Sequence, residues 1–212
     1  MSKLRLGVLA SGNGSNLQAI MDAAHKGEID ATVAVVVCDH RDAYALVRAK
    51  QKGIPAYFVD FYSFEHKAAY EEEIIRILQK QQVDLVCLAG YMRIVSSVML
   101  NAFPQRIMNI HPALLPSFPG LHGQQQAFLY GVKFSGCTVH FIDQGVDSGP
   151  IIAQAAVPVS EDDTVDSLAA RILEQEHIIY PNAIQLYAEG RLKIVGRKVH
   201  VRGSRFEIRG SN

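Results

Sequence analysis

An α/β fold built around a mainly parallel, doubly wound sheet is the architecture that this sequence predicts. Short apolar runs typical of strands alternate with segments of ten or more residues that have helical spacing. Connections of that length form right-handed βαβ units, in which successive strands run in the same direction. With 212 residues, 49% of them apolar, the chain can build a complete core. Residues 1–212 are therefore expected to form a single domain, and disordered or disulfide-stapled classes are excluded.

The first half of the chain predicts four strands separated by three helices. The strands cover 4–10, 31–38, 56–59 and 83–89, and the helices cover 16–24, 41–52 and about 70–79. The second strand is almost entirely β-branched or small and apolar, which is typical of a strand buried on both faces. The second helix ends before Gly53, a residue that suits the left-handed end of a helix.

The second half adds three strands, a long helix and a basic terminus. The strands are expected at 107–110, 137–142 and 150–159, and the helix at about 164–189. Residues 191–212 hold seven Lys or Arg and one Glu, which predicts a solvated antiparallel C-terminal hairpin or tail with turns at Gly196-Arg197 and Gly203-Ser204. Ligands bind at the carboxyl ends of parallel strands, so the loops after the first, fourth, fifth and sixth strands are the expected sites.

Composition and charge exclude several classes of protein. The 21 basic and 21 acidic residues cancel, so no overall field favours nucleic acid. No apolar run approaches the roughly 20 residues of a membrane span, and the apolar stretch near the N-terminus ends at Ser11, too early for a signal peptide. Cys38, Cys87 and Cys137 lie in predicted strands without a Cys-x-x-Cys pair, which indicates buried, reduced thiols. A soluble, cytoplasmic protein is expected.

The first loop, Ser11-Gly-Asn-Gly-Ser-Asn16, joins a strand to a helix. Its two glycines permit a tight turn, and the helix start offers free N–H groups and the positive end of a dipole, which together suit a single phosphate. A plain capped turn is the structural alternative. A dinucleotide site would also use Gly12, Gly14 and Asp39, but its third glycine position is occupied by Leu17.

The segment 108–122 contains the pattern most indicative of catalysis. Strand alternation places Asn109 and His111 on one face, where an amide donor and an imidazole can stabilise an oxyanion and move a proton. Pro112, Pro116 and Pro119 exclude regular structure behind them and stiffen the loop. A strand end with a histidine satisfied in the core is the alternative interpretation.

Two carboxylates are further candidates. Asp147 lies in a loop of mostly small residues, where it can approach an imidazole on another loop or simply be a solvated turn residue. Glu176 falls on the apolar stripe of the last helix, so it needs a partner, either a structural Lys or Arg or a cationic group of a ligand. Metal ligation by His111, His122, His140 and Asp147 is disfavoured, because the sequence has no metal-ligand spacing such as His-x-x-x-His.

Together these motifs resemble the phosphoribosylglycinamide formyltransferases, a family of folate-dependent enzymes of purine synthesis. The similarity extends from Leu4 to about Lys193, and beyond it the tail matches no recognised pattern. It rests on the first loop and on the motifs Leu88-Ala-Gly-Tyr-Met-Arg93, Asn109-Ile-His-Pro112, Leu115-Pro116, Pro119-Gly-Leu-His122 and Asp147-Ser-Gly-Pro150. Ser148-Gly149 stands where the family often has two glycines. The resemblance implies a Rossmann-like formyltransferase fold and transfer of the formyl group of 10-formyltetrahydrofolate to the amine of 5-phosphoribosylglycinamide, without a metal.

The resemblance also implies a role for individual residues. Asn109, His111 and Asp147 would be catalytic, with Asp147 favouring the imidazolium form of His111 and relaying the proton of the attacking amine. The ribonucleotide would be bound by Gly14, Ser15, Asn16 and Glu176. The folate would be bound by Lys67, Met92, Arg93, Ile94, Val95, Asn109, Ile142, Asp143, Gln144, Gly145, Val146 and Asp147. The expected partners are the two small-molecule substrates, with no nucleic acid and no membrane, and the choice between a monomer and a homodimer stays open.

Related functions are kept as alternatives. A methionyl-tRNA formyltransferase would need a further C-terminal domain and a basic RNA surface, for which 212 residues leave no room. A formyltetrahydrofolate hydrolase would lack the sugar-phosphate loop, and a sugar-nucleotide formyltransferase fits that loop less well. A nicotinamide-dependent oxidoreductase or a nucleotide-binding module would leave Asn109, His111 and Asp147 without a role.

Overall fold

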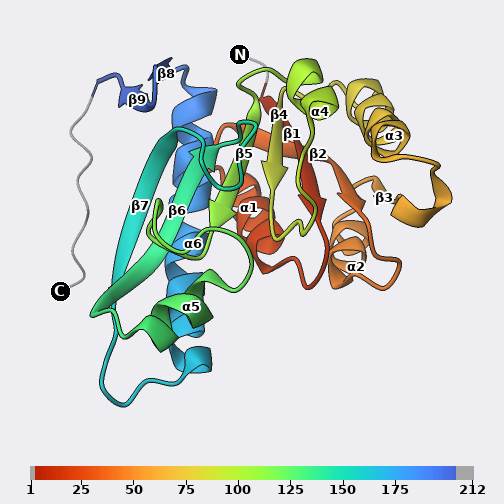
Figure 1. Ribbon diagram of the computed structural model, residues 1–212. Coiled ribbons are helices and arrows are strands. Elements are labelled where there is room, and N and C mark those ends of the chain that lie inside the picture. Colours follow the sequence, from red (N-terminus) through yellow and green to blue (C-terminus); the bar gives the residue numbers. More distant parts are fainter. Residues whose placement is uncertain (1–2, 204–212) are drawn as a thin grey trace.

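Five parallel strands form one half of the sheet in the computed structural model, which describes residues 3–203. They are β1 (Leu4–Ala10), β2 (Ala31–Cys38), β3 (Ala56–Phe58), β4 (Leu85–Leu88) and β5 (Ile107–His111), in the order β3-β2-β1-β4-β5. They are connected through α1 (Ser15–Lys26), α2 (Tyr44–Gln51), the short 3-10 helix η1 (Phe61–Ser63), α3 (Lys67–Lys80) and α4 (Ser97–Ala102). The parallel, helix-connected sheet that the alternating pattern predicts is confirmed (Figure 1).

The other half of the sheet is mostly antiparallel. β6 (Phe134–Phe141) runs antiparallel to β5, and β7 (Ile151–Pro158) runs antiparallel to β6. α5 (Gly123–Tyr130) precedes β6, and α6 (Val165–Ala188) follows β7. The predicted C-terminal hairpin consists of β8 (Leu192–Val195) and β9 (Lys198–Val201), and β9 joins the edge of β7. The predicted turn at Gly196-Arg197 is confirmed, whereas Ser204 and the rest of the tail lie outside the described residues.

The direction of β6 corrects one expectation about the site. Because β6 is antiparallel to β5, Phe141 at its end is paired with Met108 near the start of β5. The loop 142–150 therefore begins at the edge opposite to the carboxyl ends of the parallel strands, and it must fold back to reach them. A pattern of strand-like runs predicts where strands lie but not their relative direction, which depends on pairing between distant segments.

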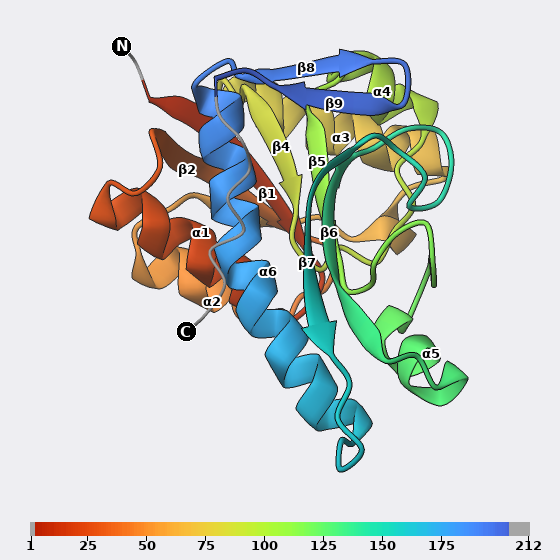
Figure 2. The same cartoon turned by 90° about the vertical axis from the view of Figure 1, so that its left-hand side faces the viewer.

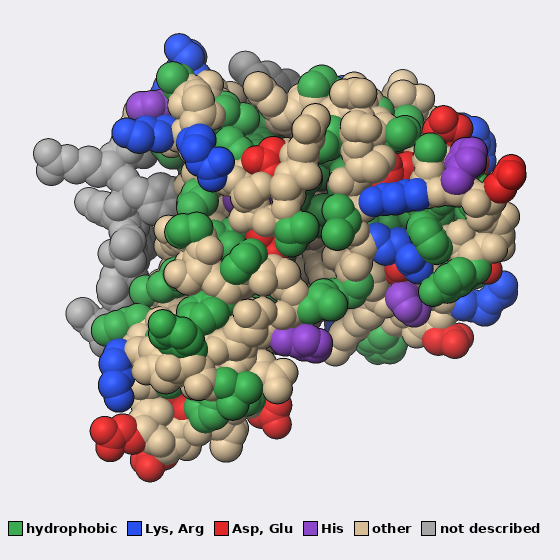
Figure 3. Space-filling model, viewed as in Figure 1, with side chains coloured by type: hydrophobic (Ala, Val, Ile, Leu, Met, Phe, Trp, Pro, Cys, Tyr) green, Lys and Arg blue, Asp and Glu red, His purple; other side chains and the backbone are tan. Residues whose placement is uncertain are grey.

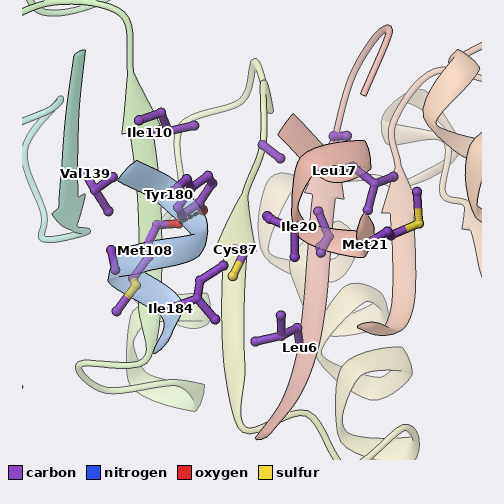
Figure 4. Close-up of a cluster of buried hydrophobic side chains, with 14 of the residues drawn as sticks. Leu6, Leu17, Ile20, Met21, Cys87, Met108, Ile110, Val139, Tyr180 and Ile184 are labelled. Atoms are coloured by element: carbon purple, nitrogen blue, oxygen red, sulfur yellow. Dashed lines mark hydrogen bonds between the residues drawn. The ribbon is translucent and has the colours of Figure 1, made fainter. Parts of the chain in front are cut away.

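The sheet is covered on both faces. α1, α2 and α6 pack on one face and α3 and α4 on the other, which is the doubly wound arrangement. In Figure 2, α1 and α6 lie side by side in front of the sheet, with α3 and α4 behind it. Figure 4 shows part of the cluster under α1 and α6, which includes Leu6, Leu17, Ile20, Met21, Cys87, Met108, Ile110, Val139, Tyr180 and Ile184. The hydroxyl of Tyr180 lies 3.0 Å from the carbonyl oxygens of both Leu88 and Met108, so α6 is held against the end of β4 and the start of β5.

The described helices differ from the predicted ones in several boundaries, and they include short helices that the sequence did not indicate. α2 begins at Tyr44 rather than at residue 41, because the chain at His40 to Ala43 forms a turn in which Ala43 N–H donates to His40 O. α4 and α5 were not predicted, and with six and eight residues they are too short to show a clear helical period. Among the helices of residues 3–203, none has the length and hydropathy that crossing a bilayer requires.

Candidate active site

Two adjoining cavities open at the carboxyl ends of the parallel strands. The larger, about 770 Å³, lies between β4, β5, the loop after β6 and the N-terminal half of α6. The smaller, about 360 Å³, lies against the loop between β1 and α1. Ser15, Asn16, Gly90 and Met92 line both cavities. Two ligands bound in these cavities would therefore meet at this junction.

The loop between β1 and α1 leaves the N-terminus of α1 open to the smaller cavity. Gly14, the residue before the helix, has φ 73, a left-handed conformation that glycine adopts without strain. Within residues 3–203 no side chain caps the first N–H groups of α1, so these donors and the positive end of the helix dipole are available to an anion. α2 supports the loop from outside, because Ala45 N–H donates to Gly12 O and Arg48 donates to both oxygens of Asn13. The geometry suits a phosphate.

Glu176 lies on α6, lines the larger cavity beside the junction residue Asn16, and is 6% exposed. Its Oε2 accepts a hydrogen bond of 2.7 Å from Nδ2 of Asn16, and among residues 3–203 no Lys or Arg forms an ion pair with it. Burial raises the pKa of Glu176 to about 7, and the Asn16 contact offsets this only in part. Asn16 Oδ1 is also buried and has no hydrogen-bond partner in the described structure. The pair thus presents acceptor oxygens to a ligand that carries hydroxyl or amine hydrogens.

β5 presents Asn109 and His111 to the larger cavity, as strand alternation predicts. His140 of β6 is paired in register with Asn109. Its Nδ1 lies 2.9 Å from the carbonyl oxygen of Phe141, so this nitrogen carries the proton, and Nε2 accepts from Asn109 Nδ2 at 3.2 Å. His140 thereby orients the Asn109 amide, which keeps a second N–H for a ligand.

His111 is buried between a carbonyl group and a carboxylate. Its Nε2 donates to Phe118 O at 2.8 Å, and its Nδ1 lies 3.3 Å from Asp147 Oδ2. Burial lowers the pKa of His111 below its ordinary value and outweighs the Phe118 carbonyl and the Asp147 carboxylate, which both raise it. The predicted effect of Asp147 thus has the right sign, but the net shift in the free protein is opposite, because desolvation is larger.

Asp147 reaches His111 because the loop 142–150 folds back over the sheet. Its backbone is left-handed, with φ 49, and Gly120 N–H donates to its Oδ2 at 2.8 Å. Its Oδ1 lies 3.6 Å from Nε2 of His140. Burial alone would raise the pKa of Asp147, but its surroundings, which include the hydrogen bond from the Gly120 N–H, lower it below its ordinary value. Asp147 is therefore an ionised carboxylate between two imidazoles at neutral pH.

The structure places three of the four candidate metal ligands close together. Although His111, His140 and Asp147 lie together, no group of three or more His, Cys, Asp or Glu in the described part of the chain is arranged to hold a metal ion. His122 is exposed at the start of α5.

Most residues predicted to bind a folate surround the larger cavity. Met92 and Ile94 are 59% and 60% exposed, so they offer apolar surface to a ligand. The cavity wall also includes Arg93, Val95, Asn109, Ile142, Asp143, Gly145, Val146 and Asp147. Lys67 and Gln144 line neither cavity, since Lys67 is the first residue of α3 and Gln144 is exposed on the loop after β6. The structure does not bring these two residues to the site.

Asp39 and Arg93 form a pair beside the cavities. Arg93 Nε lies 2.6 Å from Asp39 Oδ2, and its guanidinium stacks on the ring of Phe61 at 4.0 Å. The Nδ1 of His40 lies 2.9 Å from the other oxygen of Asp39. A dinucleotide site would need an acidic residue here to bind a ribose hydroxyl, but both oxygens of Asp39 are already in contact with nitrogens of Arg93 and His40. The pairing argues against that alternative.

Sequence reasoning assigned no orienting role to His140 and no binding role to Gln124 or Asp166. Gln124 and Asp166 line the larger cavity from α5 and α6, and Gln124 Oε1 is buried without a hydrogen-bond partner in the described structure. The register of β5 and β6 would have identified His140, but register is a long-range property. α5 shows no helical period that would have directed attention to Gln124.

An amide, an imidazole and a carboxylate converge on one partly apolar cleft, and such groups act together in the transfer of acyl-type groups. The fold and the site thus define an α/β transferase. The profile of the family described as Formyl transferase matches residues 4–184, and the chain belongs to this family.

The relatives support this assignment over nearly the whole chain. The phosphoribosylglycinamide formyltransferase of Escherichia coli is 43% identical over 203 residues, which cover 96% of this chain and 96% of the relative. The crystal structure of glycinamide ribonucleotide transformylase 1 from Symbiobacterium toebii is 56% identical, with a TM-score of 0.93 and 94% coverage of each chain. The trifunctional purine biosynthetic protein adenosine-3 of Drosophila melanogaster is 46% identical over 88% of this chain, which spans 14% of that longer protein.

Proposed function

We propose that this protein transfers the formyl group of 10-formyltetrahydrofolate to the amine of 5-phosphoribosylglycinamide, a step of de novo purine biosynthesis. The observation that carries the proposal is the junction of the two cavities at Asn16, beside Glu176, on the same cleft as Asn109, His111 and Asp147. The smaller cavity suits a phosphate and the larger suits a long, partly apolar ligand. The names of the relatives support glycinamide ribonucleotide as the acceptor of a formyl group.

The ribonucleotide occupies the smaller cavity and the junction. Its phosphate accepts hydrogen bonds from the first N–H groups of α1, which the turn at Gly14 leaves open at Ser15 and Asn16. The buried oxygens of Glu176 and Asn16 accept hydrogens from the sugar hydroxyls or the amine end. This binding directs the amine toward β5.

The folate occupies the larger cavity. Met92, Ile94 and Val95 contact its ring system, and the loop at 142–147 covers it with backbone donors and acceptors. The volume of about 770 Å³ lies within the range of cavities that bind such ligands. Arg93 contributes its backbone, because its guanidinium is engaged by Asp39.

In the reaction, the amine attacks the formyl carbon and negative charge develops on the formyl oxygen. The free N–H of Asn109 donates to that oxygen, and His111 donates to it through Nε2–H once this group leaves the carbonyl oxygen of Phe118. His111 is neutral in the free protein, but the ligands exclude water and the new negative charge adds to that of Asp147, so the imidazolium is favoured as the charge develops. Asp147 accepts the proton of the attacking amine, directly or through water, and returns it to the departing folate nitrogen.

The test is an assay with both purified substrates, in which folate absorbance reports formyl transfer. We expect a change only when formyl-folate and the ribonucleotide are both present. Deformylation without the ribonucleotide would support the hydrolase, and activity only with an amino sugar nucleotide would support the sugar-nucleotide enzyme. Absence of all three reactions would contradict the proposal.

A further inference from the structure

The basic C-terminal hairpin is a part of the molecule that the proposed reaction does not use. Its Lys and Arg side chains gather over β8 and β9 at the upper left of Figure 3. One of them is directed at the catalytic loop: Nη2 of Arg197 donates a hydrogen bond of 2.7 Å to the backbone carbonyl of Ser148. Ser148 directly follows Asp147 in the chain.

The loop 142–150 needs support from outside, because its conformation is unusual. Asp147 has φ 49, in the left-handed region that few residues other than glycine occupy, although aspartate does so more readily than most. Gly149 crosses the end of β6 so closely that a Cβ there would lie 1.8 Å from Phe141 O. On the inner side, Asp143 Oδ1 accepts hydrogen bonds from Gly145 N–H and from the Ser148 hydroxyl.

Ser148 is therefore held from two directions. Its hydroxyl is bound within the loop, and its carbonyl is bound by Arg197 of the hairpin. The hairpin is attached to the sheet where the loop ends, through the pairing of Ile151 with Lys198, the residue after Arg197. Figure 2 shows the hairpin at the same end of the molecule as the loop between β6 and β7.

We propose that Arg197 is a positioning residue for Asp147, and that the hairpin braces the loop which carries this carboxylate to His111. Arg197 itself touches neither cavity. Its guanidinium limits the rotation of the Ser148 carbonyl, and thereby keeps the left-handed turn at Asp147 in the geometry that places Oδ2 against His111. The kinetic part of the following test rests on the proposed function, whereas the exchange part does not.

The test compares Arg197→Gln with Arg197→Lys and with Lys193→Gln, which removes the same charge from an exposed position on β8 of the same hairpin. For Arg197→Gln we expect kcat to fall about fivefold to tenfold, as for loss of one charge-assisted hydrogen bond. KM for formyl-folate should rise, because this loop lines the folate cavity, while KM for the ribonucleotide stays unchanged. Arg197→Lys should restore part of kcat, and Lys193→Gln should match the wild type.

Hydrogen–deuterium exchange supplies a measurement that does not depend on activity. In Arg197→Gln, backbone N–H groups of 142–150 should exchange faster, while those of α1 keep the wild-type rates. An unchanged exchange pattern would overturn the proposal. So would equal losses of kcat in Arg197→Gln and Lys193→Gln, since the hairpin would then act through its charge. If the wild type transfers no formyl group but exchange in the loop 142–150 still becomes faster in Arg197→Gln, the positioning role of Arg197 is supported and the proposed function is contradicted.

Discussion

Burial determines the pH at which the carboxyl group of Glu176 loses its proton. Its usual pKa of 4.5 is raised to about 7 because the side chain is almost completely removed from water and has an amide rather than a cation as its partner. A group whose pKa is higher in the folded state than in the unfolded state stabilises the protein fully at pH values below its unfolded pKa. This stabilisation is lost as the pH rises through the folded pKa. Stability and substrate binding are thus coupled at one residue.

For Glu176→Gln we expect the stability difference from the wild type to depend on pH. Between about pH 4.5 and pH 7 the wild type should lose up to about 3 kcal/mol of unfolding free energy relative to the variant, because only the wild type must bury a charge. Urea unfolding at pH 5 and pH 8 measures this. KM for the ribonucleotide should rise at the same time. Parallel stability curves would show that Glu176 titrates normally.

Asp147→Asn tests the electrostatic contribution of the loop carboxylate. The substitution removes the charge that raises the pKa of His111, so this pKa should fall further below its ordinary value, as NMR titration of the imidazole would report. The developing charge would lose its cationic donor, and kcat at pH 7 should fall on the order of a hundredfold with little change in KM for the ribonucleotide. Glu72→Gln, on the exposed face of α3, is the control and should leave kcat unchanged. A near-normal kcat with an unshifted His111 would contradict the catalytic interpretation.

At the scale of elements, the turn between β1 and α1 is shaped by its contact with α2. Gly14 combines a φ of +73 with a close approach to Ala45, whose Cβ would lie 2.7 Å from a Cβ added at Gly14. α6 completes the site from the other side. Tyr180 lies one helical turn after Glu176 and binds the carbonyl oxygens of Leu88, at the end of β4, and Met108, near the start of β5. These contacts set the depth of Glu176 in the cleft.

Gly14→Val should weaken ribonucleotide binding while folate binding remains nearly intact, because the turn must shift away from α2 and misalign the first N–H groups of α1. Gly27→Val is a matched control: Gly27 ends the same helix with the same φ of +73 but has nothing within 4 Å of an added Cβ. Both variants should lose about 1 to 3 kcal/mol of stability through backbone strain. Calorimetry with each ligand distinguishes them, and equal loss of both ligands in Gly14→Val would indicate a purely structural loop.

At the scale of the whole molecule, helices cover both faces of the sheet and thereby limit the reactivity of the three cysteine thiols. Cys38, Cys87 and Cys137 are free and buried, as predicted, and burial raises the pKa of Cys38 and of Cys87 to about 12. The pKa of Cys137 is raised as well, by burial and by Glu176. We expect no rapid reaction of the native protein with a thiol reagent at pH 8, and three reactive thiols after unfolding in guanidinium. A fast-reacting thiol in the native state would show that one face of the sheet opens.

Local sequence patterns predicted the longer elements and part of the site, but not the short helices α4 and α5. Alternation with a period of two placed Asn109 and His111 on one face of β5, and the glycine-rich turn before α1 predicted an open helix terminus, because both properties depend on residues that are neighbours in the chain. The resemblance of several motifs to one family added the expected chemistry. The positions of β1, β2 and α6 followed from apolar runs long enough to show their period.

Other features depend on contacts between segments far apart in the chain, and no local pattern encodes them. The antiparallel direction of β6 brings His140 opposite Asn109 and requires the loop 142–150 to fold back, so that Asp147 meets His111. The net pKa shift of His111 is downward because all the elements packed around the imidazole contribute to its desolvation. The sequence indicated only the anionic neighbour, Asp147, which raises the pKa. For the same reason Glu176 proved to pair with Asn16 rather than with a cation, since its partner is set by how α6 packs against α1.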